Sequence, residues 1–190
     1  FLNKYKNNSN TKGNISETEL YMVLQSLMGE DEIIRCGGDT ATCDIRVNRK
    51  DQTKPTILFE NKNYTRSVDT EEIKKFERDI MLQKTHGIFL SQSSPITYKG
   101  NFQIDVKEGL IMVYVPNTEN NAEKIKVAID IVDSLSQYIK PEDIKETKKE
   151  IDCTIKEETM KIIIDEFVEF GKKKMKMIEI VKEMSARLIA

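Results

Sequence analysis

The feature that most constrains the fold is a pair of short apolar runs separated by a polar turn. The first run alternates over residues 44–47, the second is the continuous apolar segment 57–59, and residues 48–55 between them are polar and end in proline. Two such runs joined by a turn-rich segment predict a β-hairpin. Because side chains alternate between the faces of a strand, Glu60 and Lys62 are expected to share one face of the second strand.

Pairing of these two strands would bring Asp44 beside Glu60. Two carboxylates that lie so close together are costly unless a cation lies between them. Mg²⁺ (or Mn²⁺) suits such a pair, because Mg²⁺ binds one or two protein carboxylates and fills its other positions with water and substrate phosphate. The hairpin therefore predicts a divalent metal site with the ammonium group of Lys62 next to it.

Asp44 followed by Glu60-Asn61-Lys62 at the end of an apolar strand resembles the D…(E/D)-x-K signature of the restriction-endonuclease-like PD-(D/E)XK nuclease superfamily. Among members of this superfamily, the chain is similar to uncharacterised domains in large DNA viruses of eukaryotes. The chain departs from the pattern at one position, since Cys43 stands where the superfamily's usual motif name has proline.

The resemblance extends over roughly residues 12–139. The segment Lys12–Leu20 resembles the start of the first helix of that fold, in which a glutamate often faces the metal, and Glu17 is the best match. The segment His86–Gln92 corresponds to the strand that follows the second helix. The fold that the resemblance implies is an α/β sandwich with a mixed central sheet.

The function that the resemblance implies is metal-dependent hydrolysis of phosphodiester bonds in DNA. In such a site Asp44 and Glu60 hold Mg²⁺, and the backbone carbonyl of Asn61 is a further ligand. Lys62 positions the attacking water or stabilises charge on the phosphate. Gln92 stands where related nucleases often carry a polar residue near the scissile phosphate.

Several of these residues also have simpler explanations. Glu17 and its competitor Glu19 follow Ser16, which is a plausible helix N-cap, so both glutamates would complement the helix dipole. Gln92 is also explained as a polar strand end. Asp39 is a rival to Asp44 as the first acid, but an aspartate after two glycines is usually a turn residue.

The second helix, which begins after a capping box at Asp69 and Glu72, carries a basic outer face that is a candidate for phosphate contact. The alternative for this face is ordinary solvation. Tyr64 stacks on a base or simply packs, and for His86 we expect no catalytic role. The candidate nucleic-acid contacts are therefore Tyr64, Lys74, Lys75 and Arg78.

The chain as a whole predicts three parts. Residues 1–14 are rich in Asn, Lys and Ser and predict a flexible lead-in. Residues 15–139 form the nuclease-like domain, in which a helix and three strands precede a second helix, further strands and a third helix. Residues 140–190, beginning beside Pro141, form a helical tail.

The tail carries apolar residues at alternating spacings of three and four. This heptad seam, broken only by Lys174, predicts a coiled coil or a helical pair, and hence a homodimer or a partner helix. Two sites related by symmetry could cut both strands of a duplex. The residues of the seam are Met160, Ile163, Phe167, Phe170, Lys174, Met177, Val181, Met184 and Leu188.

Composition narrows the remaining possibilities. Hydrophobic residues make up 38% of the 190 residues and charged residues 33%, which favours a modest core with an extended solvated element. No apolar run is long enough to cross a membrane, and no phosphate-binding glycine loop or nucleophile elbow is present. Because the chain opens with Phe1, we expect it to be part of a longer protein.

Cysteine and charge content bear on compartment and partner. Three cysteines without zinc-like spacing, and a single histidine, predict reduced thiols in an intracellular compartment. The net charge of −2 leaves only a local basic rim for contact with nucleic acid. A catalytically idle module for binding and oligomerisation is the alternative function. The acidic charge and the heptad tail favour it, whereas the three converging charges at residues 44, 60 and 62 oppose it.

Overall fold

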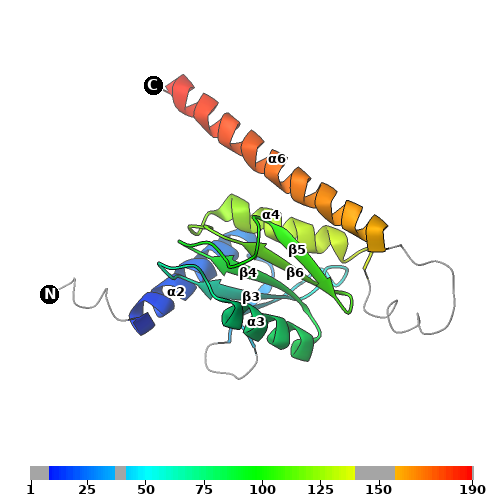
Figure 1. The fold of residues 1–190 in the computed structure, drawn as a ribbon. Coiled ribbons are helices and arrows are strands. Elements are labelled where there is room, and N and C mark those ends of the chain that lie inside the picture. Colours follow the sequence, from blue (N-terminus) through cyan, green and yellow to red (C-terminus); the bar gives the residue numbers. More distant parts are fainter. Residues whose placement is uncertain (1–8, 37–41, 140–156, 190) are drawn as a thin grey trace.

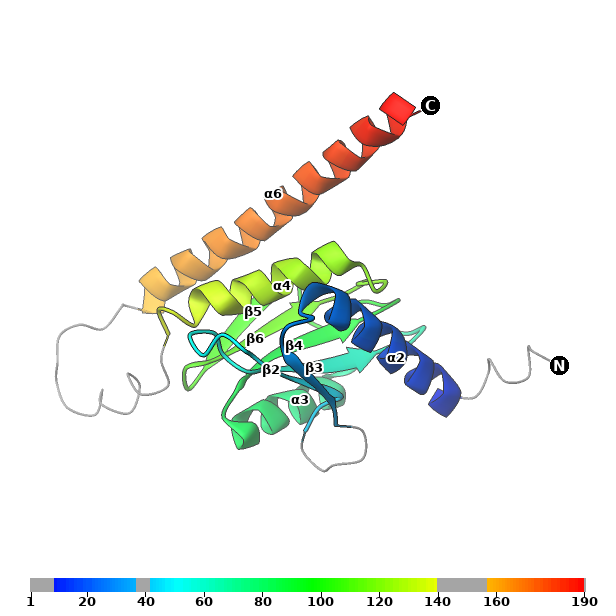
Figure 2. The same ribbon diagram turned by 180° about the vertical axis from the view of Figure 1, so that it is seen from behind.

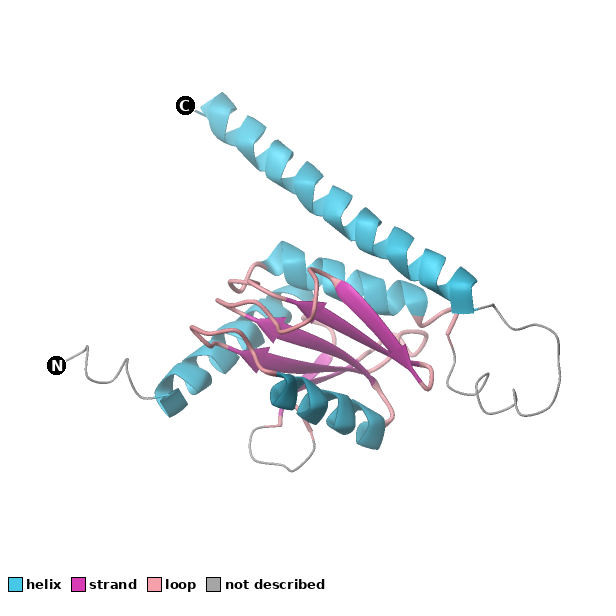
Figure 3. Cartoon of the chain, in the orientation of Figure 1, coloured by secondary structure: helices cyan, strands magenta, loops and turns pink. Residues whose placement is uncertain are grey.

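The computed structural model describes residues 9–36, 42–139 and 157–189, which form an α/β fold with a mixed six-stranded sheet and four helices (Figures 1 and 3). Within these ranges no helix is long and apolar enough to span a membrane. The helices are α2 (Ser9–Leu27), α3 (Thr70–Gln83), α4 (Ala122–Leu135) and α6 (Glu157–Ile189). The strands are β1 (Glu32–Arg35), β2 (Ile45–Asn48), β3 (Ile57–Lys62), β4 (His86–Ser91), β5 (Gln103–Lys107) and β6 (Leu110–Val115).

The strand order in the sheet is β1-β2-β3-β4-β6-β5. The central strands β3, β4 and β6 are parallel, and β1, β2 and β5 run antiparallel to their neighbours at the edges. The predicted hairpin is confirmed, with Ile45 opposite Phe59, which places position 44 beside position 60. Buried central strands explain why β3, β4 and β6 are continuous apolar runs rather than alternating ones.

Helices cover the two faces of the sheet in different ways (Figures 1 and 2). On one face α2 and α4 pack against Phe59 and the buried side chains of the neighbouring strands, such as Ile88 and Val113. On the other face α3 packs against Leu58 and Phe89. Since Leu58 faces α3, the alternation along β3 turns Glu60 and Lys62 to the α3 side as well.

Helix α3 begins at the predicted N-cap, Asp69, whose side chain accepts hydrogen bonds from the backbone N–H groups of Glu71 and Glu72. It packs very closely on β4 at Gly87. A Cβ atom at Gly87 would lie 2.3 Å from the Cδ1 atom of Ile80, so only glycine allows this approach. The close contact fixes the C-terminal half of α3 over the amino ends of β3 and β4, where Gly87 pairs with Leu58.

The first helix differs from the prediction. Helix α2 begins at Ser9, so the expected N-cap, Ser16, lies inside the helix, and residues 9–14 are helical rather than a lead-in. Ser16 is buried and accepts a hydrogen bond of 2.9 Å from the side chain of Asn61. Glu17 and Glu19 are consequently well inside the helix, so the dipole does not account for either residue.

The tail contains a long helix, α6, that packs along α4 (Figure 2). Lys174, the break in the heptad seam, lies 2.8 Å from Asp130 of α4, which explains the polar residue at that position. Phe167 also packs on the core, whereas Phe170 and Met177 are exposed. Pro141 and the side chains of Met160, Ile163 and Leu188 lie outside the described residues.

Candidate functional site

The centre of the candidate site is the pair Asp44 and Glu60, at the point where β2 begins and β3 approaches its end. The backbone N–H of Asp44 donates to the carbonyl of Phe59 at 3.0 Å, and the backbone N–H of Asn61 donates to Oδ2 of Asp44 at 2.7 Å. These bonds hold the Asp44 carboxylate against β3. Glu60 is only 1% exposed. Burial, and then the charge of Glu60, raise the pKa of Asp44 to about 7.

Lys62 lies against this pair on the same face of β3. Its Nζ atom is 2.7 Å from Oε1 of Glu60 and 3.1 Å from Oε2 of Glu72, on α3. Burial disfavours the ammonium form, but the charges of Glu60, Asp44 and Glu72 outweigh burial and raise the pKa of Lys62 above its usual value. The lysine is therefore fully charged and held from two sides.

Glu72 links Lys62 to a further residue of the site. The hydroxyl of Tyr64 donates to Oε1 of Glu72 at 2.9 Å, while Lys62 contacts the other carboxylate oxygen. The sequence assigned Glu72 only to a capping box. The structure instead turns its side chain away from the helix terminus and toward β3. Tyr64, a candidate for base stacking, thus lies beside the site as part of the support of Lys62.

Helix α3 brings a stripe of charged side chains to the site. Glu72, Lys75 and Asp79 are separated by three and four residues and so share one side of the helix. The Nζ atom of Lys75 lies 3.9 Å from Oε1 of Glu60, and the buried Asp79 accepts two hydrogen bonds from Arg78. Sequence reasoning missed Glu72 and Asp79. Their spacing relative to Lys75 was the signal that could have identified them.

The two acidic candidates of the first helix point in different directions. Glu17 lies 3.6 Å from Arg35 of β1, and its negative charge contributes to the raised pKa of Asp44. Glu19 instead accepts a hydrogen bond of 2.8 Å from the side chain of Asn120, at the start of α4. Of the two, Glu17 is the residue on the side of the carboxylate pair.

Gln92 lies on the opposite face of β3 from Glu60. Its side-chain amide donates to the side chain of Asn61, and its carbonyl oxygen accepts from the backbone of Asn120 at 2.7 Å. Since Asn61 also donates to Ser16, these residues form a buried polar network between α2 and the sheet. The structure therefore brings Gln92 together with the side chain of Asn61 rather than with Lys62.

Cys43 adopts a left-handed backbone conformation, with φ of 42°. Proline, whose φ is fixed near −65°, could not adopt this conformation, which gives a structural reason why position 43 is not proline. Burial, and then the charges of Glu60, Asp79 and Asp44, raise the pKa of the Cys43 thiol far above its usual value. The thiol is therefore protonated and serves as an apolar wall beside the carboxylates.

The remaining predicted residues lie around or away from this centre. Lys74 is exposed on the outer side of α3. His86 is buried, accepts a hydrogen bond of 3.0 Å from the backbone N–H of Ile111, and has a pKa lowered to about 4 by burial. His86 starts β4 and Glu60 nears the end of the parallel strand β3, so the two lie at opposite ends of the sheet. Asp39 lies outside the described residues.

The donor set suits a hard divalent cation. Asp44 and Glu60 offer two neighbouring carboxylates, and the pKa of Asp44 is raised first by burial and then by the negative charge of Glu60. Among the described residues, no group of three or more His, Cys, Asp or Glu side chains is placed to hold a metal ion. Two carboxylates match Mg²⁺, which retains several water ligands, rather than an ion in a closed cage.

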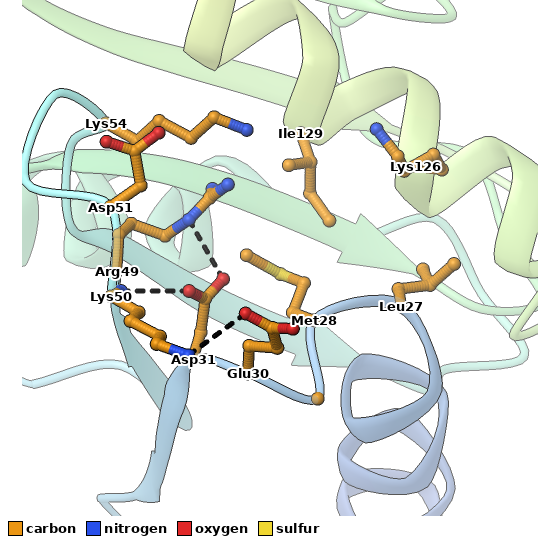
Figure 4. Close-up of a pocket in the computed structure, with 11 residues that line it drawn as sticks. Leu27, Met28, Glu30, Asp31, Arg49, Lys50, Asp51, Lys54, Lys126 and Ile129 are labelled. Carbon is orange, nitrogen blue, oxygen red and sulfur yellow. Dashed lines mark hydrogen bonds and ion pairs between the residues drawn. The ribbon is translucent and has the colours of Figure 1, made fainter.

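A hollow of about 490 Å³ lies at the other end of the sheet from this site, beside the turn between β2 and β3 (Figure 4). Its basic side chains are neutralised by neighbouring carboxylates. Arg49 is paired with Asp31 and Asp133, and Lys50 is paired with Glu30. These pairs tie the β2–β3 turn to α4 and to the start of β1, which indicates a structural clamp.

Comparison with protein-family models finds no match to this chain, and comparison with curated proteins finds no relative.

Proposed function

We propose that the chain is a metal-dependent nuclease of the restriction-endonuclease-like type that hydrolyses phosphodiester bonds in DNA. The observation that carries the proposal is the convergence of Asp44, Glu60 and Lys62 at one end of β3, where two carboxylates and one ammonium group share a buried space. Such a grouping is costly to maintain and has no packing function that apolar residues would not serve better.

In this proposal Asp44 and Glu60 hold Mg²⁺ or Mn²⁺, with Glu17 available on the side of α2 and the backbone carbonyl of Asn61 as a further ligand. When bound there, the ion supplies Lewis-acid polarisation of a phosphate oxygen. Lys62 keeps a positive charge beside the reacting phosphate, where it stabilises developing negative charge. Glu72 holds Lys62 in place when Glu60 turns to the metal.

In this proposal the basic side chains around the carboxyl end of β3 contact the nucleic acid. Lys75 lies close enough to Glu60 to meet a phosphate at the site, and Arg78 lies one turn further along α3. Lys74 is on the outer side of the same helix. A local basic rim of this kind agrees with a net charge of −2, since the protein surface as a whole need not attract DNA.

The test is cleavage of supercoiled plasmid in the presence of Mg²⁺ or Mn²⁺. The native chain is expected to nick and linearise plasmid, and Glu60→Gln and Lys62→Ala are each expected to abolish cleavage without unfolding. The matched controls are Glu30→Gln and Lys50→Ala, which alter an exposed Glu–Lys pair with side chains 85% and 70% exposed at the other end of the sheet. Absence of cleavage on plasmid, single-stranded DNA and RNA would favour the idle binding module instead.

A further inference from the structure

Two loop segments leave the candidate site side by side. Segment 63–69 follows Lys62 at the end of β3, and segment 93–99 follows the end of the parallel strand β4. The backbone N–H of Val68 donates to the carbonyl of Pro95 at 2.9 Å, and Val68 also pairs in parallel with the next residue of that loop. The loop after β4 is therefore held against the segment that joins the candidate site to α3.

The loop after β4 ends in a tight turn that exposes Tyr98. The backbone N–H of Lys99 donates to the carbonyl of Ile96 at 3.1 Å, which makes Thr97 and Tyr98 the two central residues of a β-turn. Tyr98 is 89% exposed, more than any other large hydrophobic side chain in the described ranges. Its backbone φ is 59°, in the left-handed region that glycine and asparagine adopt most readily. Tyrosine is thus an unfavourable residue for this position of the turn.

The turn is anchored on both sides of Tyr98. Ile96 is buried among the apolar residues that α3 covers. Lys99 forms ion pairs with Glu77 of α3 and with Asp105 of β5. The side chain of Tyr98 therefore projects into solvent from a backbone that is fixed before any ligand binds.

Packing does not explain the conformation of Tyr98. Phe102 also has a left-handed backbone, with φ of 55°, but its ring is fully buried in the core, and this burial offsets the cost of the conformation. Tyr98 gains no such burial. Unfavourable backbone conformations that the surrounding structure maintains are concentrated at sites of ligand contact. The exposed ring on a left-handed, anchored turn indicates a contact with another molecule.

The surface of the two segments suits nucleic acid better than protein. Arg66, on the segment that leaves Lys62, is 81% exposed, and its guanidinium group lies 3.9 Å from Asp69. Tyr98 is the one large exposed hydrophobic side chain of the two segments, whereas the centre of a protein interface gathers several. Guanidinium, hydroxyl and amide groups donate hydrogen bonds to phosphate oxygens. The exposed hydroxyl and amide residues are Asn63, Thr65, Ser67 and Ser93.

We propose that Tyr98 stacks on an unpaired base of a DNA strand whose backbone passes Arg66 to reach the pair Asp44 and Glu60. Every base has a π-face, so an exposed tyrosine binds a single strand with little preference for sequence. The bases of a duplex are already stacked on one another, so the ring favours single-stranded stretches such as an overhang or a melted end. The position of the scissile phosphate follows from the proposed function, on which this inference rests.

The test is binding of a labelled oligothymidylate of about 12 nucleotides, measured by fluorescence anisotropy with the whole chain in EDTA, where metal-dependent cleavage does not occur. Tyr98→Ala is expected to weaken binding roughly 5- to 150-fold, the range for loss of one base–aromatic stack. Tyr98→Phe keeps the ring and is expected to bind as the native chain does. Tyr98→Asn suits the left-handed backbone, so it is expected to lose binding while denaturant melts show undiminished stability.

Arg66→Ala tests the contact with phosphate. It is expected to weaken binding and to reduce the magnitude of the slope of log affinity against log salt by about 0.7, the change for one phosphate contact on a single strand. Tyr98→Ala is expected to leave this slope unchanged, because stacking releases no counterions. The matched controls, both expected to bind as the native chain does, are Tyr138→Ala, at a tyrosine 71% exposed after α4, and Lys50→Ala, at a lysine side chain 70% exposed at the other end of the sheet.

Three outcomes would overturn the inference. They are native-like binding by Tyr98→Ala, an equal loss of affinity for a duplex of the same length, and a native chain that does not bind at roughly 100 micromolar, the weak end of non-specific DNA binding. Plasmid cleavage by the native chain together with native-like binding by Tyr98→Ala would remove the stacking and keep the nuclease. Loss of binding in Tyr98→Ala, when the native chain cleaves nothing, would support the stacking and remove the nuclease.

Discussion

Replacing Asp44 by asparagine is expected to stabilise the metal-free protein at neutral and alkaline pH. In the folded chain the pKa of Asp44 is raised from 3.8 to about 7, by burial and then by the charge of Glu60. That difference corresponds to about 4 kcal/mol of cost for holding the carboxylate charged in the fold. Asparagine keeps the acceptor for the backbone N–H of Asn61, so the hydrogen bond of 2.7 Å is retained while the cost disappears.

Proton linkage gives the direction in which the free energy of unfolding changes with pH. Between pH 4 and pH 7 the folded chain holds a proton on Asp44 that the unfolded chain has lost, so native stability falls as the pH rises through this range. Above pH 7 Asp44 is ionised in the folded chain, and the whole free-energy cost of its buried charge lowers the stability. The free energy of unfolding of Asp44→Asn is therefore expected to exceed that of the native chain by about 2–4 kcal/mol at pH 8 and to equal it near pH 4.

The assay is urea denaturation at several pH values, in EDTA and in 10 mM Mg²⁺. Mg²⁺ is expected to stabilise the native chain by about 1–2 kcal/mol for a millimolar dissociation constant, and to have no effect on Asp44→Asn. The matched control is Asp51→Asn. Asp51 lies in an exposed turn where hydrogen bonds from Thr53 lower its pKa, so this variant gains no stability. A loss of stability in Asp44→Asn at pH 8 in EDTA would refute the reasoning.

Three further predictions rest on the packing around the site. Gly87→Ala is expected to lower the free energy of unfolding by about 3 kcal/mol or more, because the added Cβ would overlap side chains of α3. Gly13→Ala, where the added Cβ would have no atom within 4 Å, is expected to raise the free energy of unfolding by about 1 kcal/mol, and denaturant melts measure both changes. Burial lowers the pKa of His86 from 6.5 to about 4, so the unfolded chain takes up a proton on this residue before the folded chain does as the pH falls. Between pH 7 and pH 4 the free energy of unfolding of the native chain is therefore expected to fall by about 3 kcal/mol more than that of His86→Gln. Cys43→Pro is expected to lower the melting temperature sharply and Cys43→Gly to leave it nearly unchanged, because only glycine accepts φ of 42° freely.

The sequence was sufficient to predict the part of the site that depends on local geometry. The period of two along β3 placed Glu60 and Lys62 on one face, and the length of the turn placed Asp44 opposite Glu60. Both inferences require only a strand and its hairpin partner. The order of helices and strands followed from apolar periodicity for the same reason.

The sequence did not predict features that depend on how separate elements meet. Ser16 carries the local signature of an N-cap, yet it is buried inside α2 because Asn61 needs a polar partner there. Gln92 stands at the end of its strand as expected, but which face it uses is set by Asn61 and the backbone of Asn120. A heptad seam likewise shows that α6 is amphipathic without showing which of its sides α4 covers.

The two faces of β3 carry different groups: Asn61 lies in a buried polar network on one face, and Glu60 and Lys62 of the candidate site lie on the other. This arrangement explains the rigidity of the Asp44 side of the candidate site. Asn61 projects into the buried network with Ser16 and Gln92, where each polar group has a partner. Its backbone N–H donates to Asp44 on the other side of the strand. The network therefore fixes the peptide that orients the Asp44 carboxylate. An E-x-K motif whose middle residue is anchored in this way holds the Asp44 carboxylate in place before any ligand binds, as the proposed nuclease would require for electrostatic stabilisation of its reaction.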